Sequence, residues 1–169
     1  MRRQDPAPLL AAVDAILACV RSGGKVLFFG NGGSAADAQH AAAELVGRFA
    51  RERRAVAALA LSTDTSILTA IGNDYGFDRV FARQIEALGK RGDVAVAIST
   101  SGVSPNVLAG VKSARAAGLT TVGLTGRDGG ALGHDVDIHV NVPQPTIARI
   151  QEVQRTLLHV LCELVEREL

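Results

Sequence analysis

The sequence predicts an α/β protein: a single-domain three-layer α/β/α sandwich on a five-stranded parallel sheet with flavodoxin or Rossmann-type winding. Five short runs indicate strands, and the one at 26–29 is apolar without polar alternation, as expected of a parallel strand that is covered on both faces. Helical patterns lie between these runs, and strands that alternate with helices imply right-handed crossovers. The length of 169 residues fits one domain spanning 1–169.

Each element has its own signal in the sequence. Apolar residues at helical spacing over 8–20 predict an N-terminal helix within 1–22, which the two glycines that follow should end. We expect strands at 26–29, 55–61, 94–98, 120–124 and 136–142. We expect further helices at 34–49, 67–71, 81–88, 105–117 and 147–169, and a break in the chain at 72–76.

Composition excludes several classes of protein. Hydrophobic residues make up 47% of the chain, too many for disorder, and no apolar run reaches the roughly 18 residues of a membrane span. The net charge is +1 without a basic block, so we expect neither a nucleic-acid nor a membrane partner. The basic start, 1–6, leads into no signal-type core. Cys19 and Cys162 lie in apolar helical patterns, which indicates reduced thiols of a cytoplasmic protein.

The first strand runs into a glycine-rich turn and an alanine-rich helix. Gly30, Gly32 and Gly33 permit backbone angles that a side chain would forbid. Ser34 stands where an N-cap would, and Asp37 completes a loose capping box. The start of this helix favours phosphate, through its N–H groups and its dipole. The turn alone is weak evidence, because it matches neither a P-loop nor a dinucleotide-binding signature.

A comparable turn follows the third strand. Ser99, Thr100, Ser101 and Ser104 place four hydroxyls beside a helix that begins at Pro105. These hydroxyls suit the oxygens of a phosphate, and the alternative is that they merely cap the helix. Two such turns at the carboxyl edge of one sheet favour the phosphate site.

Two groups of side chains could carry chemistry. His40 and Glu44 are four residues apart and share a helix face, which is the start of a divalent-metal site, although such pairs also occur on solvated faces. Gln151 and His159 lie on the last helix, where a lone histidine among apolar neighbours is more often a core residue. From the residues alone, both interpretations of each group remain open.

Stretches 30–40, 72–76, 99–104 and 149–152 together resemble the phosphoheptose isomerases of the sugar-isomerase (SIS) domain superfamily. The resemblance covers nearly the whole chain from about residue 24 onward. It implies a homotetramer, with sites at subunit interfaces, that converts D-sedoheptulose 7-phosphate to D-glycero-D-manno-heptose 7-phosphate. This reaction would supply heptose for lipopolysaccharide or another surface glycan.

The resemblance also implies roles for individual residues. Glu44 and His159 would be catalytic. One Zn²⁺ per subunit would be bound by His40, Glu44, Gln151 and His159. The sugar-phosphate substrate would be bound by Asn31, Gly32, Gly33, Ser34, Glu44, Arg48, Asn73, Asp74, Ser99, Thr100, Ser101, Ser104 and Gln151.

The rival interpretations are a non-catalytic SIS binding protein, like the factor that associates with the bacterial replication initiator, and a sugar-phosphate sensor. That factor lacks counterparts of Glu44 and His159, and the sequence shows no fused DNA-binding segment, so we favour the enzyme. Two features depart from the family pattern: a short segment before the first strand, and Gln154 where a histidine is common.

Helix geometry adds an expectation about assembly. Gln151 and His159 are eight residues apart, about 12 Å of helix rise, whereas ligand bonds to zinc are about 2 Å long. We therefore expect these two ligands of one ion to come from different chains. Helix 147–169 would then be an interface helix, and Glu44 would meet His159 across a subunit boundary.

Overall fold

The computed structural model describes residues 5–169, so residues 1–4 of the predicted N-terminal segment lie outside the described part. One sheet of five parallel strands forms its centre. In spatial order these are β2 (Ala58–Ala60), β1 (Val26–Gly30), β3 (Val94–Ser99), β4 (Thr120–Gly126) and β5 (Ile138–Val142). This order is the flavodoxin-like one, and it confirms the predicted winding.

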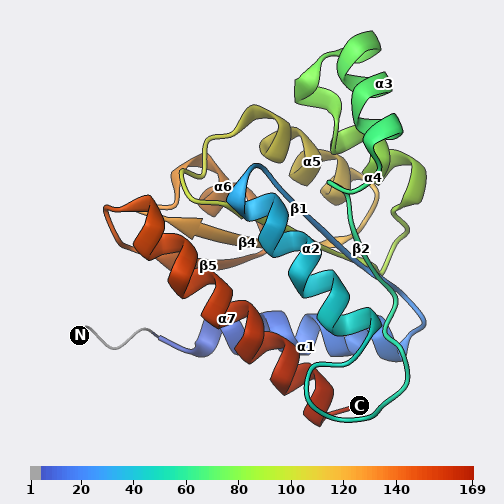
Figure 1. Ribbon diagram of the computed structural model, residues 1–169, viewed down its shortest axis with the longest axis vertical. Coiled ribbons are helices and arrows are strands. Elements are labelled where there is room, and N and C mark those ends of the chain that lie inside the picture. The colour runs from blue at the N-terminus through green and yellow to red at the C-terminus, as the bar shows by residue number, and fades with distance from the viewer. Residues whose placement is uncertain (1–4) are drawn as a thin grey trace.

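Helices cover both faces of the sheet (Figure 1). They are α1 (Ala7–Arg21), α2 (Gly33–Val46), α3 (Thr65–Tyr75), α4 (Ala82–Leu88), α5 (Pro105–Ala116), α6 (Gly130–Asp135) and α7 (Ile147–Arg167), with a 3₁₀ turn η1 at Phe77–Arg79. Helices α1, α2 and α7 bury one face, and α3 to α6 bury the other. In β1, Val26 and Phe28 join the first core while Leu27 and Phe29 join the second, which explains the continuous apolar run.

Two predicted boundaries are wrong, and two short elements were not predicted. The break expected at 72–76 occurs only at Gly76, with φ 86°, because α3 continues through Asn73 and Asp74 to Tyr75. Strand β2 has three residues, since it is an edge strand that pairs with β1 alone. The short elements α6 and η1 were not expected, because so few residues give no readable period. No helix within residues 5–169 is long and apolar enough to cross a membrane.

The capping box predicted for the second helix is also wrong. Helix α2 begins at Gly33 with Gly32 at the N-cap position, φ 55°, and no side chain caps it. Ser34 lies inside the first turn and is 4% exposed. A Cβ on Gly30 would lie 2.8 Å from the Cβ of Ser34, so the tight approach of strand and helix requires glycine there. Asp37 binds α7 instead.

Candidate active site and metal-binding group

Helices α2 and α7 lie side by side on the same face of the sheet (Figure 1). Residues that come later in α2 contact residues that come later in α7. Asp37 accepts hydrogen bonds from Arg155, and His40 faces His159. Because both helices return from the same edge of a parallel sheet, they run in the same direction, and each turn of one meets a turn of the other.

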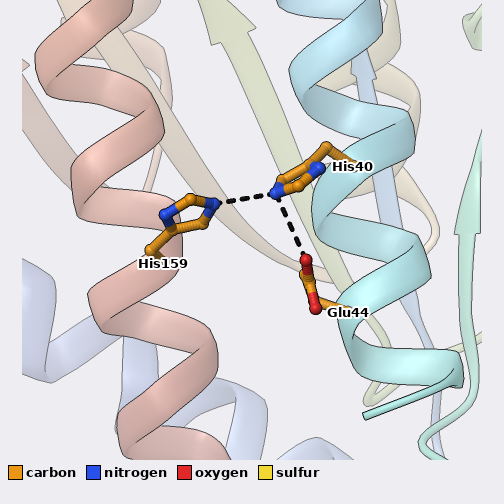
Figure 2. A group of neighbouring side chains, drawn as sticks. All are labelled: His40, Glu44 and His159. Atoms are coloured by element: carbon orange, nitrogen blue, oxygen red, sulfur yellow. Dashed lines mark hydrogen bonds and ion pairs between the residues drawn. The ribbon is translucent and has the colours of Figure 1, made fainter. Parts of the chain in front are cut away.

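His40, Glu44 and His159 form one compact group between these helices, and Figure 2 shows both imidazole rings directed toward each other above the carboxylate. Nε2 of His40 lies 2.7 Å from Nε2 of His159 and 3.3 Å from Oε1 of Glu44. One ligand atom from each residue lies within 4.8 Å of the other two. All three side chains are half-buried, and Phe49 stacks on His159 with ring centroids 5.6 Å apart.

This donor set fits a divalent cation. Two imidazole nitrogens and a carboxylate oxygen form a common protein ligand set for such ions. In a tetrahedral site with bonds of about 2.0–2.1 Å, neighbouring ligand atoms are roughly 3.3–3.4 Å apart. The separations of 2.7 and 3.3 Å from Nε2 of His40 lie near that spacing. The three residues therefore form a possible metal-binding group within a single chain.

The expectation that Glu44 meets His159 across a subunit boundary is wrong, because one chain brings these residues together. The spacing argument concerned Gln151 and His159, which both lie on α7, whereas the packing of α2 beside α7 brings Glu44 to His159. Gln151, two turns before His159, packs on the glycine turn instead. Its Nε2 lies so close to Gly33 that a Cβ on that glycine would overlap it. Gln151 as a fourth ligand stays a prediction. Gln154, the noted departure, is fully buried on the inner face of α7.

A cavity of about 450 Å³ opens beside the metal-binding group, between the start of α2 and α7. It is lined by Gly33, Asp37, Ala148, Gln151, Glu152, Arg155, Thr156 and His159. A small polar molecule held here would contact His159 directly. Another cavity, of about 470 Å³, lies on the outer face of α5 and includes none of the predicted site residues.

The serine turn after β3 is held by its own hydroxyls. Ser99 Oγ accepts a hydrogen bond from the Gly102 N–H at 3.1 Å, and Ser104 Oγ lies 3.4 Å from Ser99 Oγ. Ser101 Oγ accepts one from the Val103 N–H at 3.4 Å. Ser104 is the N-cap residue of α5, yet its side chain makes no capping bond. Helix capping therefore does not account for these hydroxyls.

An amide pair links the glycine turn to the serine turn. Asn31 and Asn106 each donate a side-chain hydrogen bond to the other's oxygen, both at 2.8 Å. Asn106 is 2% exposed and sits at the second position of α5. The sequence analysis missed it, because an asparagine in a first helical turn has no distinguishing signal until its neighbour in space is known.

The structure does not bring all predicted substrate ligands together. Asn73 and Asp74 are exposed on α3, where the Asn73 amide donates to the Asp74 carboxylate at 2.7 Å. Figure 1 shows α3 at the opposite end of the molecule from α7. Arg48 is exposed just beyond the end of α2, one turn after Glu44. Thr100 lies on the serine turn, and its carbonyl oxygen faces Gly126 at the end of β4.

The end of α2 is fastened to α7 by a buried network that the sequence analysis also missed. The Arg53 guanidinium donates to the carbonyl oxygens of Glu44 and Leu45 at 2.7 and 2.8 Å, and lies 3.4 Å from the Glu166 carboxylate. Glu166 accepts hydrogen bonds from three successive N–H groups, of Phe49, Ala50 and Arg51. Burial raises the pKa of Glu166, but these N–H groups and the Arg53 charge outweigh it and hold the pKa below its ordinary value.

Known proteins are similar to this chain over nearly its whole length. Residues 1–126 match the SIS domain family. A phosphoheptose isomerase from Roseiflexus sp. is 57% identical over 164 residues, which cover 96% of this chain and 83% of the relative. The structure of the phosphoheptose isomerase from Neisseria gonorrhoeae matches with a TM-score of 0.90 and 50% identity, over 95% of this chain and 86% of that one. The enzyme from Francisella tularensis matches with a TM-score of 0.93 and 40% identity, over 96% and 86%.

Proposed function

The chain belongs to the phosphoheptose isomerases of the SIS domain family, and from this premise we propose that it interconverts D-sedoheptulose 7-phosphate and D-glycero-D-manno-heptose 7-phosphate through an enediol. The observation that carries the proposal is the group of His40, Glu44 and His159, which one chain gathers beside a cavity. A non-catalytic SIS protein has no need of a carboxylate and two imidazoles in this arrangement.

An aldose–ketose isomerase must move one proton between neighbouring carbons and one between their oxygens. We assign the first transfer to Glu44, whose carboxylate takes the proton from C1 of the ketose and returns it at C2. His159 moves the proton between O1 and O2, because an imidazole ring offers both a donor and an acceptor nitrogen. The 3.3 Å contact of His40 with Glu44 orients the carboxylate for this step.

We propose zinc as the ion of the metal-binding group, with His40, Glu44 and His159 of one chain as ligands and Gln151 of a neighbouring subunit as the fourth. When bound, Zn²⁺ would polarise the carbonyl oxygen of the sugar and stabilise negative charge that develops there. Glu44 has two carboxylate oxygens, so it could serve both as a ligand and as the base.

The phosphate end of the substrate is assigned to the two turns at the carboxyl edge of the sheet. The hydroxyls of Ser99, Thr100, Ser101 and Ser104 donate to phosphate oxygens, and Asn31, Gly32, Gly33 and Ser34 border the same space from β1. Arg48, Asn73 and Asp74 complete the set of substrate ligands. Binding energy from the phosphate then holds the reacting carbons against Glu44 and His159.

The wider setting is part of the same proposal. We propose a homotetramer in which α3 of one subunit completes the site of another, since Asn73 and Asp74 lie far from their own chain's metal-binding group. Both cysteines are buried free thiols, and burial raises the pKa of Cys162 to about 12, so it stays protonated, as suits a reducing cytoplasm. The product would enter heptose synthesis for lipopolysaccharide or another surface glycan.

The test is isomerisation of sedoheptulose 7-phosphate by the purified protein. We expect turnover that a chelator abolishes and that added Zn²⁺ restores. A protein that binds the sugar phosphate without converting it, with or without Zn²⁺, would support the binding-protein or sensor class instead.

A further inference from the structure

Asp37 and Arg155 form an ion pair between α2 and α7. Nε and Nη2 of Arg155 both donate to Oδ1 of Asp37, at 2.9 and 2.6 Å. The side chain of Asp37 is 2% exposed, whereas that of Arg155 is 56% exposed and borders the cavity beside His159. A carboxylate buried to this degree requires a charged partner, and the guanidinium from the neighbouring helix supplies it.

The position of this pair matters for the metal-binding group. Asp37 precedes His40 by three residues on α2, and Arg155 precedes His159 by four on α7, so the pair lies one turn before the two imidazoles. Any slide or rotation of α7 against α2 therefore changes the Nε2–Nε2 distance, because a shift of one residue is about 1.5 Å. Ligand distances in protein metal sites lie within about 0.2 Å of their ordinary values.

Within residues 5–169, this is the one ion pair formed directly between α2 and α7. The Arg53–Glu166 pair joins α7 to the segment that follows α2, and so fixes the far end. The imidazoles lie between these two attachments. Both histidines have half-buried side chains.

We propose that Asp37 and Arg155 are positioning residues that set the register of α2 against α7 and thereby hold His40 and His159 at metal-binding distance. The inference rests on the proposed function, because it assumes that the group binds a divalent ion. Neither residue is a ligand or an acid–base group; each acts through the helix that carries an imidazole.

The experiment measures Zn²⁺ affinity by calorimetry on the full chain after removal of metal, with Co²⁺ absorption as a report on ligand geometry. We expect Arg155→Gln and Asp37→Asn each to bind Zn²⁺ 10- to 100-fold more weakly, as for other residues that orient ligands. The double variant should lose no more than either single one, since one contact is removed in every case. Arg155→Lys should recover part of the affinity, because it keeps the charge without the planar fork.

A matched control separates positioning from general stability. Lys25 and Asp93 form a similar pair, a buried carboxylate with a half-buried cation, at the opposite edge of the sheet. Lys25→Gln should lower the melting temperature as Arg155→Gln does, while Zn²⁺ affinity and the Co²⁺ spectrum stay unchanged. Circular dichroism confirms folding, and Arg155→Lys carries the test if Arg155→Gln does not fold.

The outcomes are distinguishable. If folded Arg155→Gln binds Zn²⁺ as tightly as the wild type does, and the wild-type enzyme is active, the positioning role of Asp37 and Arg155 is overturned. The proposed function then stands. A wild-type chain that neither binds Zn²⁺ nor turns over the sugar phosphate overturns both.

Discussion

Asn31 and Asn106 hold each other's side-chain amides in a reciprocal pair, with two hydrogen bonds of 2.8 Å between the ends of two neighbouring strands. Asn31 follows β1 and Asn106 opens α5, which the serine turn precedes. The pair therefore fixes the glycine turn relative to the serine turn. Because the proposed phosphate site uses both turns, their spacing is part of the site.

We expect Asn106→Ala to raise KM for the sugar phosphate more than it lowers kcat. The change deprives the Asn31 amide of its partner and should cost about 1–3 kcal/mol of folding free energy. Steady-state kinetics and urea unfolding measure the two effects. Unchanged KM, with the expected loss of stability, would mean that the pair supports the fold without shaping the site.

Glu44→Gln should abolish turnover while the fold stays intact. Glutamine keeps the size of the side chain and one acceptor oxygen, but it cannot take a proton from carbon. Loss of a positioned base lowers kcat by about 10² to 10⁴-fold. Circular dichroism checks the fold, and proton exchange at C1 of the ketose reports the lost step. A kcat near that of the wild type would remove Glu44 from the mechanism.

Ser101→Ala combined with Ser104→Ala should weaken binding of inorganic phosphate. Each hydroxyl contributes about 1 kcal/mol or somewhat more, because its partner is charged. Calorimetry gives the affinity, and Ser113→Ala is the control, since Ser113 contacts Glu86 on the exposed side of α5. Ser99 is left intact because its hydroxyl holds the Gly102 backbone. Equal affinities of the double variant and the control would assign these hydroxyls to the turn alone.

Glu166→Gln should destabilise the protein at neutral pH and remove part of its acid sensitivity. Breaking a buried ion pair from one side costs about 3–5 kcal/mol. Because folding lowers the pKa of Glu166, its contribution is complete above the unfolded value of about 4.3 and disappears as pH falls through the lower folded value.

Urea unfolding from pH 7 to pH 2 measures this difference, which should shrink below about pH 4.3. The pKa of Asp93 is also lowered, because its contacts with Lys25 outweigh the effect of burial. Asp93 titrates in the wild type and in Glu166→Gln alike, so its contribution cancels from the difference between them. Glu163→Gln, which breaks the exposed pair with Arg167, should leave the profile unchanged. A difference that is constant with pH would show that the Glu166 charge is not the cause.

Strand and helix periods were enough to predict the fold, because β1 and β3 are buried on both faces and form almost uninterrupted apolar runs in the sequence. The His40 and Glu44 pair was predictable for the same local reason, their shared helix face. The partners across helices were not: Asp37 looked like a capping residue until α7 brought Arg155 to it. Contacts between distant segments depend on register, and one sequence without its relatives carries no signal for that.

The last prediction concerns assembly. Asn73 and Asp74 are exposed at the end of α3, whereas Glu44 and His159 meet within one chain. Helix α3 lies at the opposite end of the molecule from α7, which carries His159 (Figure 1). If all four serve one substrate, Asp74 must come from another subunit. Two inactive variants, Glu44→Gln and Asp74→Asn, are therefore dissociated and reassembled together. Roughly a quarter of the sites in mixed oligomers then combine two intact parts, and activity should return to that extent.

The matched control mixes Glu44→Gln with His159→Gln. Glu44 and His159 belong to the metal-binding group that a single chain forms. Every site therefore carries at least one of the two changes, and no activity should return. Mass spectrometry establishes that mixed oligomers have formed in both experiments. Recovery in the control would mean that Glu44 and His159 act from different chains in the assembled enzyme. If no activity returned in the mixture of Glu44→Gln and Asp74→Asn, the site would lie within one subunit, and Asp74 would be needed for another reason.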